Sequence, residues 1–219
     1  MWNKKSNIIM AAIIVFALMG SLVDANVVEI SAVNSPADLD LSGNIAYAIN
    51  FGNNGNPNIG GIVFSQDQDH PNIHLDITYE GVITNWHGHY PNTGYSELDK
   101  LLGGIIWNDN RQVDQTTSVT ITNSLIAGTS YQLQLIFYTS HSLPMDIIVE
   151  GKTFIERFEP FKIQGNYPGG GSVFKCVFNA LDTTLNVALK PNPNVDPSAV
   201  SGLILTEIPK TTDSLVDYG

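Results

Sequence analysis

The stretch from Leu125 to Leu135 constrains the fold more than any other part of the chain. A short turn containing Gly128 leads to Tyr131, and Tyr131 opens a strand in which apolar and polar residues alternate. A Tyr at this place is typical of a tyrosine corner, in which the phenol oxygen bonds to the backbone a few residues upstream. The sequence therefore predicts a crossover loop at the edge of a β-sandwich.

Further segments with two-residue alternation recur along the chain, with turn-forming residues between them roughly every 8–12 positions. The expected strands are 27–31, 44–51, 61–64, 73–77, 105–107, 117–122, 131–138, 145–150, 152–156, 172–178, 184–189 and 199–206. One short helix is expected at 96–103, with Ser96 as its N-cap and Gly103 at its end. This pattern predicts an all-β fold, an antiparallel two-sheet β-sandwich with one short helix.

The N-terminal residues have the pattern of a secretory signal peptide. Lys4 and Lys5 precede an apolar run from Ile8 to Met19, and small residues follow up to Ala25. The alternative is a membrane anchor, but the run is shorter than the ~20 residues that a spanning helix needs. We therefore expect residues 1–25 to be removed, a secreted protein without membrane attachment, one sandwich domain at 26–210 and a flexible tail at 211–219.

The net charge limits the possible binding partners, and the cysteine content limits the possible disulfides. The formal net charge is -11 and cations are not clustered, so nucleic acid is not an expected partner. Cys176 is the only cysteine, which excludes an intramolecular disulfide. Alternation places Cys176 on the same strand face as Phe174 and Phe178, so we expect a buried thiol; the alternative is an intermolecular bridge.

The order of these elements resembles the secreted galactose-binding-like and malectin-like modules of jelly-roll character. The matching segments include the opening strand 46–52, the short helix before a Gly at 98–103, the corner strand 127–135 and the late strands 173–178, 183–189 and 200–205. The resemblance covers most of the chain as a pattern of strands and turns, without a reactive motif. It implies a non-catalytic module that binds carbohydrate or another extracellular polymer, sometimes with a structural calcium.

A segment rich in aromatic and polar residues is the best candidate for a ligand site. Sugar rings stack their apolar C–H faces on aromatic planes, while their hydroxyl groups need polar partners. The same aromatics could instead pack in the core, as large aromatic side chains usually do. The expected sugar-binding residues are Asn85, Trp86, His87, His89, Tyr90, Tyr95 and Trp107.

Acidic and histidine side chains nearby suggest a metal site. Asp67, Asp69 and His70 could contribute ligands for calcium, or for zinc together with neighbouring histidines. The segment lacks the Gly and the closing Glu of a helix-loop-helix calcium motif, and the histidine spacing matches no zinc signature. Solvated loop side chains are the simpler interpretation.

The sequence contains no motif for catalysis. Gly-x-Ser-x-Gly is absent, and isolated acids such as Glu80 and Glu97 cannot be paired as glycosidase carboxylates from sequence alone. We therefore expect a non-enzymatic protein that binds glycan. The alternative is a self-assembling structural protein of a matrix, coat or filament, because the chain has few charges and many polar residues.

Overall fold

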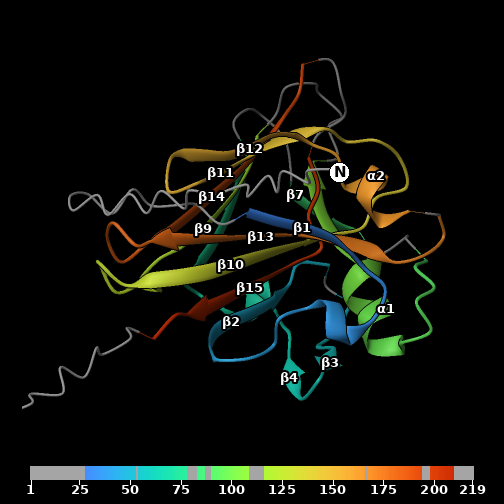
Figure 1. Ribbon diagram of the computed structural model, residues 1–219, viewed down its shortest axis with the longest axis horizontal. Coiled ribbons are helices and arrows are strands. Elements are labelled where there is room, and N and C mark those ends of the chain that lie inside the picture. Colours follow the sequence, from blue (N-terminus) through green and yellow to red (C-terminus); the bar gives the residue numbers. More distant parts are fainter. Residues whose placement is uncertain are drawn as a thin grey trace, which may run out of the picture.

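Two antiparallel sheets pack face to face in the computed structural model (Figure 1). The structure describes residues 28–52, 54–77, 83–86, 90–108, 116–165, 167–193 and 198–209. The predicted signal peptide and the predicted tail at 211–219 lie outside these residues. The architecture confirms the predicted all-β two-sheet sandwich.

Each sheet combines strands that are distant in sequence. The six-stranded sheet has the order β1 (Val28–Val33), β13 (Gly171–Asn179), β10 (Ser130–Phe137), β15 (Gly202–Glu207), β2 (Asn44–Asn50) and β5 (Ser65–Gln66). The five-stranded sheet has the order β12 (Lys152–Phe158), β11 (Met145–Val149), β14 (Leu185–Pro191), β9 (Thr117–Ile121) and β6 (Ile73–Ile77). All neighbours within the two sheets are antiparallel except β2 and β5, which are parallel.

Smaller elements cover the ends of the sandwich. The short ladders are β3 (Asn58–Ile59) with β4 (Ile62–Val63), and β7 (Ile83–Trp86) with β8 (Ile105–Asn108). The helices are α1 (Ser96–Gly103), α2 (Pro160–Gln164) and the 3-10 turns η1 (Pro36–Asp38) and η2 (Asp67–Asp69). The sequence predicted α1 but not α2, which is only five residues long.

The core between the sheets follows from strand alternation. Phe174, Cys176 and Phe178 point from β13 into this core, whereas Val173 belongs to a second cluster on the outer face of the same sheet. Cys176 is only 1% exposed, and burial raises the pKa of its thiol to about 12. The predicted buried thiol is therefore confirmed.

The tyrosine corner predicted from the sequence is present. Tyr131 is buried at the start of β10, and its phenol oxygen accepts a hydrogen bond of 3.0 Å from the backbone N–H of Ile126. The loop is also tied to the turn after β13, because the N–H of Gly128 donates to the carbonyl oxygen of Ala180 at 2.8 Å. The corner thereby fixes the chain where it enters the six-stranded sheet.

The outer face of the six-stranded sheet carries a second apolar layer. Leu98, Leu101 and Leu102 from α1 are fully buried against outward-facing residues such as Ile136 and Ile204. These three leucines lie on one side of a helix, since their spacing follows the 3.6-residue period. Part of the sheet is thus covered on both faces, which explains why the alternation of burial is lost toward the end of β10.

Two glycines allow the end of α1 to approach the end of β2. A Cβ atom on Gly52 would lie 2.0 Å from the Cα atom of Gly104, and a Cβ on Gly104 would lie 2.4 Å from the Cα of Gly52. No side chain fits between these two backbone segments. The pair therefore sets the position of α1 relative to the sheet.

We expect Tyr131→Phe to lower the free energy of unfolding by about 1 kcal/mol, because the N–H of Ile126 loses its acceptor. Chemical denaturation measures the change. Tyr95→Phe is the matched control, since the Tyr95 side chain is 49% exposed and its change should stay within about 0.5 kcal/mol. Equal stability of wild type and Tyr131→Phe would contradict the role of the corner.

We also expect Gly52→Ala to destabilise the fold by about 3 kcal/mol, because the added methyl group overlaps the backbone of Gly104. Gly128→Ala is the control: its φ of +75° is strained for alanine, but no atom lies within 4 Å, so the cost should be about 1 kcal/mol. Thermal unfolding of both variants gives the comparison. Similar losses of stability in Gly52→Ala and Gly128→Ala would show that the approach of Gly52 to Gly104 is not a tight constraint.

Candidate functional site

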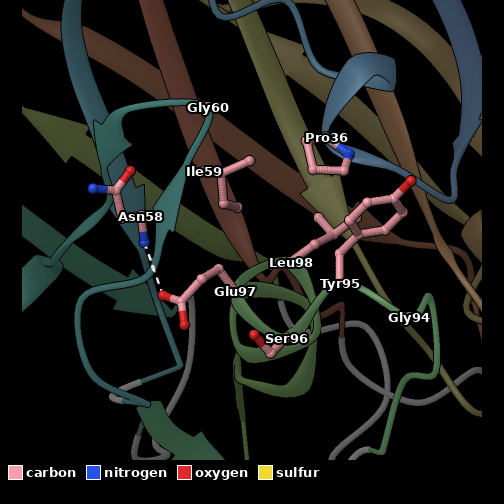
Figure 2. Close-up of a pocket in the computed structure, with 9 residues that line it drawn as sticks. All are labelled: Pro36, Asn58, Ile59, Gly60, Gly94, Tyr95, Ser96, Glu97 and Leu98. Carbon is pink, nitrogen blue, oxygen red and sulfur yellow. Dashed lines mark hydrogen bonds between the residues drawn. The ribbon is translucent and has the colours of Figure 1, made fainter.

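A pocket of about 340 Å³ lies where η1, the β3–β4 hairpin and the start of α1 meet. Figure 2 shows Pro36 and Tyr95 on one side of this pocket and Asn58 and Gly60 on the other. The lining residues are Pro36, Asn58, Ile59, Gly60, Gly94, Tyr95, Ser96, Glu97 and Leu98. We call this the Tyr95 pocket.

The floor of the Tyr95 pocket is rigid and apolar. Ile59 is 2% exposed and Leu98 is fully buried, and both belong to the cluster on the outer face of the six-stranded sheet. The hairpin that supplies Ile59 turns through Gly60 and Gly61, whose φ angles are +60° and +89°. Glycine adopts such angles readily, so the turn is short and holds Asn58 at the pocket rim.

The walls combine an aromatic ring with polar groups. Tyr95 is 49% exposed, Ser96 is exposed next to it in the chain, and Asn58 is exposed on the opposite side of the pocket. Glu97 accepts a hydrogen bond of 3.0 Å from the backbone N–H of Asn58 and is paired with Lys100. The Lys100 hydrogen bond, followed by that of Asn58, lowers the pKa of Glu97, so the carboxyl group is ionised and its charge is paired.

The segment that presents Tyr95 is anchored at two points. The backbone N–H and the hydroxyl group of Thr93 donate to Oδ1 of Asp99 at 2.9 and 2.7 Å. The N–H of Asn92 donates to the carbonyl oxygen of Gly169 at 3.2 Å. Tyr95 therefore follows two consecutive residues that are both anchored by hydrogen bonds.

One detail of the predicted helix start is wrong. Ser96 is the first helical residue, and Tyr95 occupies the N-cap position without a side-chain capping bond. Asp99, three residues after Ser96, accepts both of its hydrogen bonds from Thr93. The anchoring of the preceding loop takes the place of a side-chain cap.

The predicted sugar-binding residues that the structure describes lie on several elements. Tyr90 is 76% exposed on the segment that leads to Tyr95, and Trp107 in β8 is half-buried against the core between the sheets. Asn85 and Trp86 belong to β7, where the backbone of Trp86 is opposite that of Ile105. His87 and His89 lie outside the described residues, as do the side chains of Asn85 and Trp86.

The predicted metal ligands do not form a common binding group. Within the part of the chain that the structure describes, no three His, Cys, Asp or Glu side chains are arranged to hold a metal ion. Asp67 and Asp69 lie in η2, and His70 instead shares a hydrogen bond of 2.6 Å with the hydroxyl group of Ser65. Burial raises the pKa of Asp67.

Eight of the nine lining residues were not predicted from the sequence as site residues, among them Pro36, Asn58 and Glu97. These three come from three elements that are separated by many residues, so no local motif joins them. The available signals were the Gly-Gly turn after Asn58 and the helix start after Tyr95. These signals indicate local structure without showing that the two elements meet.

Comparisons with known proteins identify the fold. Neither a protein-family model nor a curated protein matches the sequence. Among solved structures, the chain is similar to the ANX1 ectodomain from Arabidopsis thaliana, with a TM-score of 0.56 and 13% identity over 76% of this chain and 49% of that chain. It is also similar to a chain in the complex of the plant peptide RALF23 with FER and LLG2, with a TM-score of 0.54 and 15% identity over 76% of this chain and 49% of that one.

A third similar structure is a β-glucuronidase from Bacteroides uniformis, with a TM-score of 0.51 and 13% identity over 74% of this chain and 18% of that chain. The chain thus spans about half the length of the plant receptor chains and a smaller part of the enzyme. None of the helices among the described residues is long and apolar enough to cross a membrane. The comparisons show that the chain shares the β-sandwich fold of these proteins, which is consistent with the malectin-like, galactose-binding-like resemblance of the sequence.

Proposed function

We propose that this protein is a secreted, non-catalytic module that binds carbohydrate in the Tyr95 pocket. The observation that carries the proposal is the half-exposed Tyr95 ring at the edge of a pocket with polar groups on its rim. A sugar ring presents an apolar face that can stack on the phenol ring and hydroxyl groups that need hydrogen-bond partners. Both kinds of group are present within one small site.

The hydrogen-bonding groups on the rim suit a sugar in position and charge. The side chains of Asn58 and Ser96 are exposed at the rim, and the Glu97 carboxylate is fixed by the backbone of Asn58 and by Lys100. Because these bonds hold Glu97 before a ligand arrives, little side-chain freedom is lost on binding. The proposed roles are stacking for Tyr95 and hydrogen bonding for Asn58, Ser96 and Glu97.

Secretion follows from the N-terminal pattern of residues 1–25 and is part of the proposal. The proposed absence of catalysis rests on the lack of a nucleophile or paired-acid motif in the sequence.

A structural calcium is a separate expectation from the sequence. A chelator tests it, because removal of a bound ion lowers the melting temperature.

We expect Tyr95→Ala to weaken glycan binding at least tenfold, which is about 1.4 kcal/mol, because the stacking surface is removed. A glycan array identifies the ligand, and isothermal titration calorimetry then gives Kd. Tyr95→Phe keeps the ring and should retain binding. Leu181→Ala is a second control, since this 75% exposed residue lies in the turn after β13, away from the Tyr95 pocket.

If Tyr95→Ala binds the glycan with unchanged affinity, the Tyr95 pocket is not the binding site. A wild-type protein without signal on arrays of neutral and acidic glycans would contradict carbohydrate binding itself. The RALF23 complex of the plant proteins makes a peptide a reasonable competing ligand in the same assays. The melting temperature of each variant should stay near that of wild type, because Tyr95 is not part of either core cluster.

Self-assembly is the second candidate function, and one observation favours it. Ile126 and Leu181 are 61% and 75% exposed on two loops joined by the hydrogen bond from Leu125 to Thr183. Exposed apolar residues on neighbouring loops are common at contacts between protein molecules. The loops belong to the tyrosine-corner end of the sandwich.

If these loops mediate assembly, the wild-type protein should form an oligomer that Leu181→Asp dissociates, because a carboxylate cannot be buried unpaired in the contact. Size-exclusion chromatography with light scattering measures the mass of each. A monomeric wild type over a wide concentration range would exclude the proposed contact. Glycan binding in the Tyr95 pocket should be unaffected by the substitution.

A further inference from the structure

A second exposed aromatic ring lies on a segment that is hydrogen-bonded to the loop before the Tyr95 pocket. Tyr167 is 46% exposed, and its ring stacks on Tyr138 with centroids 5.9 Å apart and planes inclined by 28°. Tyr138 is fully buried in the apolar cluster that also contains Leu98 of the pocket floor. The Tyr167 ring is therefore supported from below by the same layer that supports the pocket.

The two rings belong to segments that are bonded to each other. The hydrogen bond from Asn92 to Gly169 joins the loop before α1 to the loop after α2, and Figure 1 shows both loops at the end of the sandwich where α1 lies. Tyr95 is three residues from Asn92, and Tyr167 is two residues from Gly169. This path limits the distance between the Cα atoms of the two tyrosines to roughly 23 Å. One oligosaccharide of several rings can reach both.

The charged side chains of α1 and α2 near the two tyrosines favour an uncharged ligand. Lys100 is paired with Glu97, and Lys162 of α2 is paired with Glu159 at 2.7 Å. The chain has a net charge of -11, which repels polyanions at long range. Neither lysine is available to an acidic sugar unless an ion pair is broken.

We propose that Tyr95 and Tyr167 are two subsites for one ligand, and that the protein binds several consecutive rings of an uncharged, chain-like glycan. The proposal rests on the function proposed for the Tyr95 pocket and adds the class of ligand. An aromatic platform at each subsite gives every bound ring one stacking partner. Affinity then increases with chain length until both platforms are occupied.

The test is calorimetry with cello-, laminari- and malto-oligosaccharides of two to six glucose units, and with oligogalacturonides of matching length. In at least one neutral series, we expect the hexasaccharide to bind about tenfold more tightly than the disaccharide, a gain typical of one added stacking contact. Tyr167→Ala should abolish this gain and leave the affinity for the disaccharide unchanged. Tyr167→Phe keeps the ring and should restore the gain, whereas Tyr95→Ala should weaken binding at every length.

The possible failures are distinguishable. If a disaccharide and a hexasaccharide bind equally and Tyr167→Ala has no effect, the second subsite is wrong while the Tyr95 pocket stands. Tighter binding of the oligogalacturonides than of every neutral series would overturn the uncharged ligand. If none of the oligosaccharides binds to wild-type protein, the proposed function fails together with this inference.

Discussion

The packing of α1 on the outer face of the six-stranded sheet is the contact on which the candidate site depends. Leu98, Leu101 and Leu102 exclude water from that face, and the close approach of Gly52 and Gly104 sets the position of the helix. Hydrophobic burial of this extent is the main source of stability in a small domain. Because the helix is fixed at its end, its first turn forms one wall of the Tyr95 pocket.

The Tyr95 pocket lies apart from the core between the sheets and from the tyrosine corner. The core between the sheets and the tyrosine corner hold the sandwich together, and neither contributes a residue to the Tyr95 pocket. The pocket is built on the outer layer instead, from a 3-10 turn, a two-strand hairpin and a helix start. The exposed side chains of its rim can therefore change with limited cost to the fold, whereas Ile59 and Leu98 of its floor belong to the buried cluster.

The sequence predicted more of the fold than of the candidate site. Alternation assigned Phe174 and Cys176 to one face of β13, and Tyr131 marked the corner, because each signal is local. The terminal residues of α1 predicted a helix at 96–103, but such local signals cannot say which face of the sheet the helix covers. The sugar-site prediction followed local composition, so it included Tyr95 and also Trp107, which is half-buried. Asn58 has no such local signal, because only the tertiary structure brings it to the pocket.

The most direct test of the account is the position of a bound oligosaccharide on the surface. A neutral hexasaccharide that gives a signal on the glycan array is titrated into the protein. Two-dimensional NMR then measures the change in amide chemical shift at each residue. The account predicts that the largest shift changes occur at Asn58, Ser96 and Glu97 and near Tyr167. Changes concentrated at the loops around Ile126 and Leu181, with none at the start of α1, would contradict it.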